Sequence, residues 1–125
     1  MDAVPITPSS PTRASAEVWV VAACFNEAAG IEAFIRAIEQ LKVVQQLLLV
    51  DDGSRDGTAA VISAAIEARR GDANALPISL IELTRNFGKE AAMLAGLDQA
   101  RNHCDAVVLI DADLQHPPEL IEEMV

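Results

Sequence analysis

Strand-length runs of Val, Leu and Ile alternate with amphipathic segments along most of this chain. The runs are too short and too rich in β-branched residues for helices, so they predict four strands, at residues 18–24, 47–50, 78–83 and 106–110. Apolar residues at helical spacing predict three helices between the strands. The first helix is expected to follow Asn26 as its N-cap, the second to span 56 to about 69, and the third to span about 89 to 102. A turn is predicted at 71–75.

The predicted strands are apolar on both faces and are separated by helices, which is typical of a parallel sheet covered on both sides. We therefore predict an α/β fold, a Rossmann-like three-layer α/β/α arrangement with a mainly parallel sheet. The helix residues predicted to face the core are apolar or small: Ile31, Phe34, Ile35, Ile38, Leu41, Val61, Ile62, Ala65, Ile66, Ala91, Ala92, Ala95 and Gly96.

Polar residues follow each predicted strand directly. Right-handed crossovers place the carboxyl ends of parallel strands at one edge of the sheet, where such sheets bind ligands. The sequence therefore predicts that four polar clusters meet at this edge: 26–27, 51–52, 84–86 and 111–113.

Asp111 and Asp113 stand at i and i+2 after the fourth apolar run, so in an extended chain their side chains point to the same side. Two carboxylates held this close raise each other's pKa unless a cation lies between them. Carboxylate oxygens suit Mg²⁺ or Mn²⁺, which complete their coordination with water and substrate phosphates. The pair predicts a metal–diphosphate site. His116, beside two prolines, is expected to be a turn or cap residue.

Several polar residues allow two interpretations on sequence alone. The stretch 51–54 has the composition of a simple turn, but one carboxylate could also accept hydrogen bonds from a nucleotide base or ribose. Lys89 is either a solvated helix residue or a cation for a diphosphate. Phe25 is expected to pack or to contact a base edge.

Composition narrows the range of partners. The chain has 125 residues, 51% of them hydrophobic, and a formal net charge of −10. This composition fits one α/β domain and argues against nucleic acid as a partner, since phosphate-backbone binding needs a basic face.

Cys24 and Cys104 lack a metal or redox spacing and are expected to be reduced, in a cytoplasmic setting. No apolar stretch approaches the roughly 18–20 residues of a membrane span.

Two further expectations concern the ends of the chain. Residues 1–15 are rich in Pro, Ser and Thr and are expected to be a flexible leader, with the folded domain at 16–125. Pro117, Pro118 and Glu119 have the pattern of a helix start, only a few residues before Val125. We expect this chain to be the front part of a longer protein.

Four blocks of the sequence resemble, in order, the motifs of family 2 glycosyltransferases with the GT-A fold. They are VVAACFNE at 20–27, VDDGSRDGT at 50–58, RNFGKEAA at 85–92 and DADLQHPPE at 111–119. The last two are most similar to the polyprenyl-phosphate branch, which includes dolichol-phosphate mannose synthase and bacterial undecaprenyl-phosphate glycosyltransferases. The resemblance covers residues 17–125 and implies the N-terminal, nucleotide-binding half of a GT-A fold.

The resemblance also implies roles for particular residues. Phe25, Glu27 and Asp51 would line the nucleotide base and ribose, and Lys89 would reach the nucleotide or its phosphates. The metal site would use Asp113, with Asp111 near the ribose or metal and Gln115 completing the metal shell. Ala23 and Phe25 depart from the proline and tyrosine usual in the family, so the sequence leaves both UDP-sugar and GDP-sugar donors open.

The activity implied is transfer of a sugar from a nucleotide-sugar to a polyprenyl phosphate, with inversion and with Mg²⁺ or Mn²⁺. No catalytic residue is expected in this chain, because the acceptor side would lie beyond Val125, and little transfer is expected from the chain alone. The full-length protein is expected at the cytoplasmic face of a membrane. A non-catalytic nucleotide-sugar-binding module is the alternative. A phosphoryl-accepting receiver domain fits less well, because its acidic pair follows the first strand.

Overall fold

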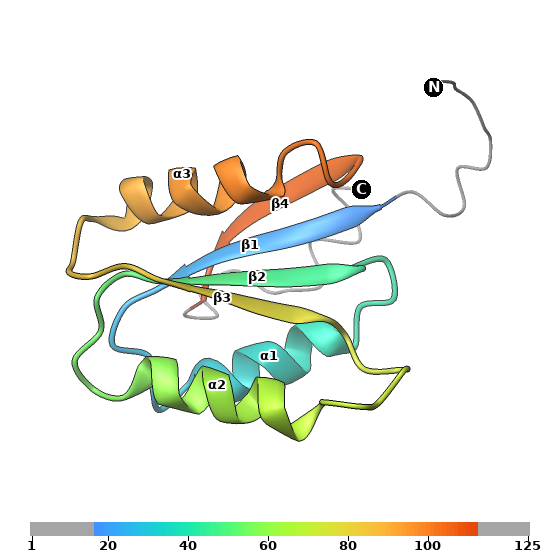
Figure 1. Cartoon of the computed structure of the whole chain (residues 1–125), viewed down its shortest axis with the longest axis horizontal. Coiled ribbons are helices and arrows are strands. Elements are labelled where there is room, and N and C mark those ends of the chain that lie inside the picture. The colour runs from blue at the N-terminus through green and yellow to red at the C-terminus, as the bar shows by residue number, and fades with distance from the viewer. Residues whose placement is uncertain (1–16, 113–125) are drawn as a thin grey trace.

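The computed structural model describes residues 17–112, which form a parallel sheet between two layers of helices (Figure 1). Helices α1 and α2 lie on one face of the sheet and α3 lies on the other. The predicted α/β/α architecture is confirmed. In chain order the elements are β1 (Val18–Cys24), α1 (Ile31–Glu39), β2 (Gln46–Asp51), α2 (Thr58–Ala68), β3 (Ile78–Glu82), α3 (Lys89–Ala100) and β4 (Ala106–Asp111).

The strand order is β3-β2-β1-β4, and every neighbouring pair is parallel. β1 therefore lies between β2 and β4, although β4 follows it by more than eighty residues in the chain. The register pairs Cys24 with Asp51, and Asp51 with Glu82, across the sheet. It also pairs Ala23 with Asp111. The final carboxylates of three strands thus lie at one edge.

The two faces of the sheet differ in the size of the side chains that cover them. The face under α1 and α2 buries large aliphatic and aromatic side chains, including Phe34 and Ile35, both fully buried. The other face is covered by α3, whose buried residues are the small ones Ala92, Gly96 and Ala100. This difference confirms the predicted apolar stripe of α1 and most of the small-residue face of α3. Ala91 is the exception, because it is exposed.

The predicted N-cap at Asn26 is wrong. Residues 27–30 form a turn in which the backbone N–H groups of Gly30 and Ile31 both donate to the carbonyl of Glu27, at 3.0 and 2.8 Å. α1 therefore begins only at Ile31, with Gly30 as its N-cap. Asn26 adopts a left-handed conformation, with φ of 53°. Its side-chain oxygen accepts a hydrogen bond from the backbone N–H of Arg55, in the loop after β2.

Other boundaries agree with the sequence to within a few residues, and the turn at 71–75 is confirmed. β2 and β4 each continue one residue further than predicted, so Asp51 and Asp111 belong to the strands and not to the loops. The expected leader at 1–15 and the expected helix after Pro117 lie outside the described residues. Within residues 17–112, no helix is both long and apolar enough to span a membrane.

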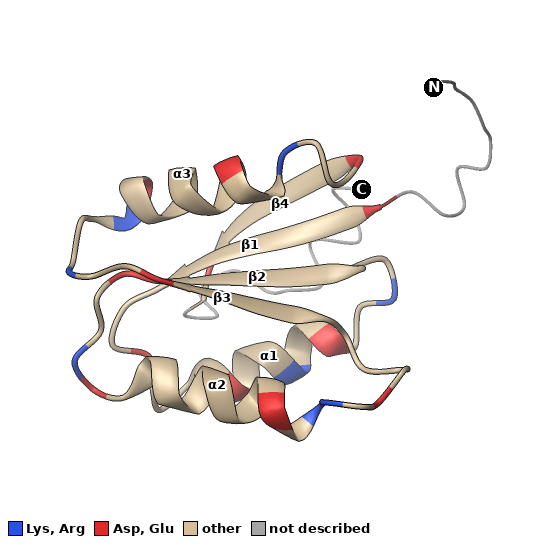
Figure 2. Ribbon diagram, in the orientation of Figure 1, with Lys and Arg blue, Asp and Glu red and all other residues tan. Residues whose placement is uncertain are grey.

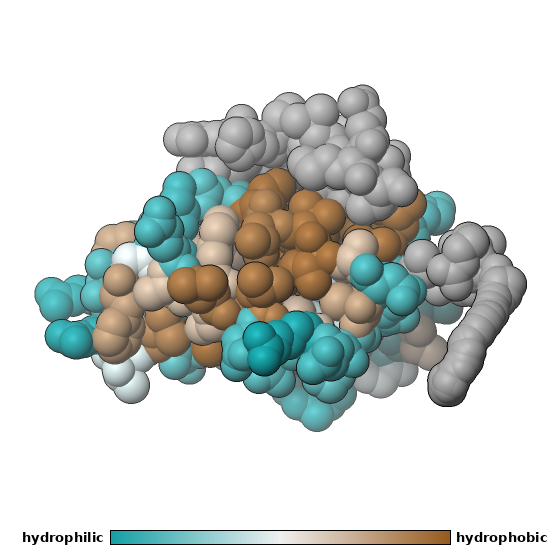
Figure 3. Space-filling view, turned by 90° about the horizontal axis from the view of Figure 1, so that it is seen from above, coloured by the Kyte–Doolittle hydropathy of each residue, from teal (hydrophilic) through white to brown (hydrophobic). Residues whose placement is uncertain are grey.

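The α3 face of the described sheet is only partly covered. Apolar side chains gather at the surface on this side of the molecule (Figure 3). Leu94 of α3 is 65% exposed and Leu109 of β4 is 44% exposed. The reason is that α3 packs mainly over β1 and β2 and touches β4 little. The expectation that every strand is covered on both faces therefore fails for β4 within the described residues.

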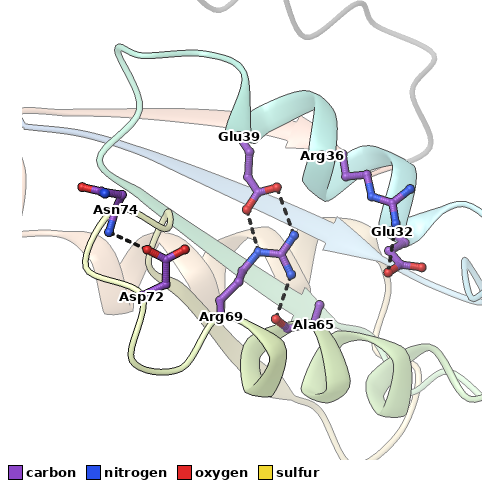
Figure 4. Close-up of polar contacts among 7 residues, drawn as sticks. All are labelled: Glu32, Arg36, Glu39, Ala65, Arg69, Asp72 and Asn74. Carbon is purple, nitrogen blue, oxygen red and sulfur yellow. Dashed lines mark hydrogen bonds and ion pairs between the residues drawn. The ribbon is translucent and has the colours of Figure 1, made fainter.

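An ion pair joins the carboxyl-terminal ends of α1 and α2 (Figure 4). Arg69 donates from Nε and Nη2 to the two carboxylate oxygens of Glu39, at 2.6 and 3.0 Å, and from Nη1 to the carbonyl of Ala65 at 2.8 Å. Both side chains of the pair are mostly buried. The hydrogen bonds from Arg69 hold the pKa of Glu39 below its ordinary value.

Candidate functional site

The loops that follow the strands meet at the carboxyl edge of the sheet, at the left of Figure 1. Acidic residues stand at the ends of β2 and β3 at this edge (Figure 2). Within the described residues, the predicted convergence of the strand-end clusters is confirmed by the topology. The side chains at this edge come from residues far apart in the sequence.

The loop after β1 is held by the loop after β2. The backbone N–H of Asn26 donates to Ser54 Oγ at 2.8 Å, that of Glu27 to Thr58 Oγ1 at 2.9 Å, and that of Ala28 to Asp56 Oδ2 at 3.0 Å. Three side chains of the 50–58 block thus accept three successive backbone donors. The block therefore does more than form a turn, since it fixes the loop that carries Phe25 and Glu27.

Asp56 has a second role at the start of α2. Its Oδ1 accepts hydrogen bonds from the hydroxyl of Thr58 at 2.5 Å and from the backbone N–H of Thr58 at 3.1 Å. The hydrogen bond from the Thr58 hydroxyl is the main reason that the pKa of Asp56 lies below its ordinary value, and the bond from the backbone N–H of Ala28 adds to the effect. Asp56 therefore remains an ionised acceptor that ties α2 to the β1 loop.

The larger of two clefts at this edge has a volume of about 720 Å³. Phe25 stands at its border, 45% exposed, while Asp51 is almost fully buried in its wall. The hydroxyl of Ser54 donates a hydrogen bond to Asp51 Oδ1, one of the two oxygens of that carboxylate. The cleft is lined mainly by polar residues of the β2 and β3 ends and their loops: Asp51, Gly53, Ser54, Arg55, Glu82, Thr84, Arg85 and Asn86.

Of these lining residues, only Asp51 was assigned a site role from the sequence, and Glu82 and Arg55 lie outside the strand-end clusters predicted there. Glu82 is the last residue of β3 and Arg55 lies inside the 50–58 block, so position alone could have suggested both. Arg85 lies with its guanidinium carbon 4.6 Å from the centre of the Phe87 ring, a cation–π contact. The cleft thus has both acidic and basic side chains, with an aromatic ring at its border.

The second cleft, of about 170 Å³, brings the remaining described site residues together. It is lined by Phe25, Glu27, Lys89 and Asp111, among others. Lys89 Nζ lies 3.0 Å from Asp111 Oδ2, although the two residues are 22 positions apart. Lys89 begins α3 and is mostly exposed, so its charge stands at the mouth of this cleft. All five residues predicted to contact the nucleotide therefore border one of the two clefts.

Cys24 lies beneath the second cleft and is buried. Burial, and after it the negative charges of Asp51 and Glu27, raise the pKa of its thiol to about 12. The thiol therefore stays protonated at neutral pH and has no nucleophilic or metal-binding character.

The predicted metal site is only partly within the described residues. Asp113 and Gln115 lie outside them, and residues 17–112 contain no group of three His, Cys, Asp or Glu side chains arranged to hold a metal ion. Asp111 supplies a carboxylate at the edge of the second cleft, the type of oxygen ligand that Mg²⁺ and Mn²⁺ prefer. The Asp111 carboxylate therefore has the chemistry of a ligand for such an ion.

Comparison with known proteins gives a consistent result. The family model described as glycosyl transferase family 2 matches residues 19–125. An undecaprenyl-phosphate 4-deoxy-4-formamido-L-arabinose transferase of Pseudomonas fluorescens is 41% identical over 112 residues, which cover 86% of this chain and 31% of that protein. An uncharacterised glycosyltransferase of Synechocystis is 40% identical over 113 residues, covering 87% of this chain and 33% of its own length. The chain thus spans about a third of these relatives.

Solved structures agree on the fold. A mannosyltransferase from Pyrobaculum calidifontis, in complex with GDP-Man and Mn²⁺, superposes with a TM-score of 0.68 and 29% identity. That match covers 78% of this chain and 28% of the mannosyltransferase. Staphylococcus aureus TarS gives a TM-score of 0.59 at 19% identity, over 78% of this chain and 16% of its own, and bears on the fold alone.

Proposed function

The chain belongs to glycosyltransferase family 2, and from that premise we propose that residues 16–125 form the donor-binding part of a GT-A glycosyltransferase. The enzyme would move a sugar from a nucleotide-sugar to a polyprenyl phosphate. The acceptor is supported by relatives named as undecaprenyl-phosphate transferases, and the donor and metal by the GDP-Man and Mn²⁺ in the mannosyltransferase complex.

One observation carries the donor-site proposal. Lys89, at the start of α3, pairs at 3.0 Å with Asp111 at the end of β4, in the cleft that Phe25 and Glu27 also border. Lys89 can neutralise phosphate charge and the Asp111 carboxylate suits a divalent metal ion, so the pair fits a metal-bound diphosphate at the carboxyl edge of the sheet. The structure thus brings together residues proposed to contact opposite ends of one ligand.

Each described residue then has a proposed part. Phe25 offers an exposed ring for the base, and Asp51 offers a carboxylate oxygen for donors on the base or ribose. Glu27 would line the base and ribose together with them. Lys89 neutralises phosphate charge and positions the diphosphate. Asp111, with Asp113 and Gln115, would hold Mg²⁺ or Mn²⁺, which would supply Lewis-acid stabilisation of charge on the leaving diphosphate.

The acceptor chemistry needs little from this part of the protein. A phosphate monoester has a second pKa near ~6, so its oxygen is largely anionic at neutral pH and needs positioning more than a strong base. We propose a single displacement with inversion and no covalent enzyme intermediate. We propose that the acceptor site lies in the part of the relatives' length that this chain does not span, so this chain alone is expected to transfer little or no sugar. The whole protein is proposed to act at the cytoplasmic face of a membrane.

Calorimetric titration tests this proposal directly. UDP, GDP and their common sugar conjugates are titrated into the chain with and without Mn²⁺ or Mg²⁺. We expect metal-dependent binding of one nucleotide class, lost in Asp113→Ala and kept in Asp105→Ala, which removes an exposed carboxylate at the opposite end of β4. Binding that ignores the metal and survives Asp113→Ala would contradict the proposed donor site.

A full-length protein that binds the donor with metal but never transfers sugar would instead favour a non-catalytic binding module. Steady sugar transfer by this chain with added polyprenyl phosphate would contradict the proposal that the acceptor site lies elsewhere.

A further inference from the structure

Asp52 is the only charged residue besides Asp51 that is buried within the described part of the chain, with 2% of its surface exposed. Its carboxylate accepts three hydrogen bonds from the loop between β3 and α3. Oδ1 accepts from the backbone N–H of Phe87 at 2.8 Å, and Oδ2 accepts from the backbone N–H of Gly88 and from Asn86 Nδ2, each at 3.0 Å. A buried carboxylate is thus satisfied entirely by a loop 34–36 residues further along the chain.

The backbone of Asp52 joins the same loops. Its N–H donates to the carbonyl of Cys24 at 2.9 Å, and its carbonyl accepts from Asn86 Nδ2 at 3.1 Å. Asp52 therefore connects the ends of β1 and β2 with the loop that precedes α3. Asn86 donates to both the side chain and the main chain of Asp52, which fixes their relative orientation.

Gly53 allows the two loops to meet at this point. It has a φ of +73°, and a Cβ there would lie within 2.8 Å of Arg85 Cα and closer still to the adjoining peptide atoms. The loops after β2 and β3 are therefore in direct backbone contact, with no space for a side chain between them. Any shift of the β3–α3 loop must break the Asp52 hydrogen bonds.

Local capping does not explain how α3 starts. Its N-cap is Gly88, which has no side chain, and no side-chain cap hydrogen bond is present at this end of the helix. Asp52 instead accepts the N–H groups of Gly88 and of Phe87 before it, so the start of α3 is fixed from the end of β2. The first residue of that helix is Lys89, which reaches Asp111. Arg85, in the same loop, lines the larger cleft.

We propose that Asp52 is a positioning residue for donor binding, and this inference rests on the proposed function. Its carboxylate sets the β3–α3 loop so that Lys89 meets the diphosphate beside Asp111 and Arg85 faces the larger cleft. Asp52 borders the smaller cleft, but its carboxylate is buried and both of its oxygens are engaged by the β3–α3 loop, so it acts through Lys89 and Arg85. Asp51 thus lines the larger cleft, whereas Asp52 borders the smaller one and holds the β3–α3 loop in place.

Asp52→Asn is the primary variant, because it keeps the shape but replaces one acceptor oxygen with an NH₂ group that faces a backbone donor. Asp72→Asn is the control, since it removes the same charge from an exposed turn away from the site. Amide hydrogen exchange is measured on both. We expect the Phe87 and Gly88 amides to exchange about 10-fold faster or more in Asp52→Asn, while the β1 amides keep their protection. Unchanged protection of Phe87 and Gly88 would overturn the proposal.

Measuring donor affinity in the presence of Mn²⁺ distinguishes a positioning role of Asp52 from a general contribution of Asp52 to the stability of the fold. Asp52→Asn is expected to weaken donor binding about 10-fold, and Lys89→Gln to have little further effect in that background although it weakens binding in the parent chain. Additive losses from the two substitutions would overturn the positioning role. If the parent chain binds no donor while the loop amides still respond to Asp52→Asn, the proposed function fails and the loop-holding role stands.

A second variant covers the case in which Asp52→Asn does not fold. Asn86→Ala removes an exposed side chain and with it the hydrogen bonds from Nδ2 to Asp52, leaving the buried carboxylate and its two backbone donors in place. We expect a smaller loss of amide protection, confined to the β3–α3 loop. Protection lost evenly across the sheet would contradict a local positioning role.

Discussion

Single residues at the carboxyl edge either face a cleft or hold a loop. Phe25 and Lys89 belong to the first group, because each has a large exposed fraction beside a cleft. Ser54, Asp56 and Thr58 belong to the second, because they accept backbone N–H groups of the β1 loop. The distinction predicts different consequences of substitution: residues facing a cleft should affect affinity more than stability.

Lys89→Gln should weaken donor binding with little effect on the fold. The Lys89–Asp111 pair is mostly exposed on the lysine side, so it contributes at most about 1 kcal/mol to stability. Loss of a charge-assisted bond to a phosphate should lower donor affinity by about 10- to 100-fold, equivalent to about 1.5–3 kcal/mol. Titration calorimetry measures the affinity. Lys42→Gln, at an exposed position, is the charge-matched control, and equal losses in both variants would contradict a specific role.

The Cys24 thiol should be almost inert in the folded protein. With its pKa raised to about 12, the thiolate fraction at neutral pH is about 1000-fold or more below that of an ordinary cysteine. Alkylation followed by mass spectrometry should label Cys24 only after denaturation. Cys104 is the internal reference: burial, followed by Glu17 and Asp105, raises its pKa, but it is half-buried and should react slowly. Labelling of Cys24 as fast as Cys104 would contradict the burial argument.

At the scale of elements, α3 packs closely on the sheet because small residues face it. A Cβ at Gly96 would lie 3.0 Å from Val50 Cγ2 and closer still to Val21 Cγ1. The position thus combines a glycine in a helix, which costs about 1 kcal/mol in propensity, with a contact that a side chain would disrupt.

Gly96→Val should destabilise the protein by about 1–3 kcal/mol, because the added methyl groups push α3 away from β1 and β2. The free energy of unfolding in urea measures the effect. Ala91→Val is the control, since it also enlarges a small residue of α3 but at an exposed position, and it should cost only the lower helix propensity of Val, about 0.5 kcal/mol. Helix propensity alone would make Gly96→Val neutral or slightly stabilising, so a loss no larger than that of Ala91→Val would contradict the packing argument.

The Glu39–Arg69 pair links α1 to α2 and should make stability depend on pH. Glu39→Gln is expected to lower the free energy of unfolding by about 1 kcal/mol at neutral pH, since a mostly buried, doubly hydrogen-bonded pair is weakened. Because the folded pKa of Glu39 lies below its unfolded value of about 4.3, the contribution is present above that value and disappears as the pH falls through the folded pKa.

Urea unfolding of both proteins across the acid range measures this loss as a shrinking difference between them. Glu32→Gln breaks an exposed pair within α1 and should change stability by less than about 0.5 kcal/mol at any pH. A difference for Glu39→Gln that stays constant into strong acid would contradict the ion-pair explanation.

At the scale of the whole molecule, the clefts are formed by loops from different strands, so the proposed donor site requires the folded sheet. Donor and Mn²⁺ should therefore raise the thermal midpoint. At a donor concentration near 100 times Kd the stabilisation is about 2.7 kcal/mol, or roughly 10 °C for a domain of this size. Removing the metal with EDTA should abolish most of the shift. A shift that is the same in EDTA would contradict metal-dependent binding.

The sequence predicted the elements well but placed one helix start wrongly. Short continuous apolar runs identified all four strands, because strands buried on both faces are apolar throughout, and a spacing of 3.6 residues identified the buried stripe of α1. Asn26 was misassigned because its type suits both an N-cap and a left-handed turn, and only the turn at 27–30 decides between them. The exposure of Leu109 could not be predicted from the local sequence pattern either, since it depends on where α3 crosses the sheet.

The sequence by itself determined the α/β class and the polar residues at each strand end, because these depend on spacing along the chain. The tertiary structure decided which of those residues meet. Asp52 could be interpreted from sequence as a turn residue, yet it holds the loop at 86–88, and Lys89 finds Asp111 across the edge. These contacts depend on the strand order β3-β2-β1-β4 and its register, which arise from long-range packing and not from any local pattern.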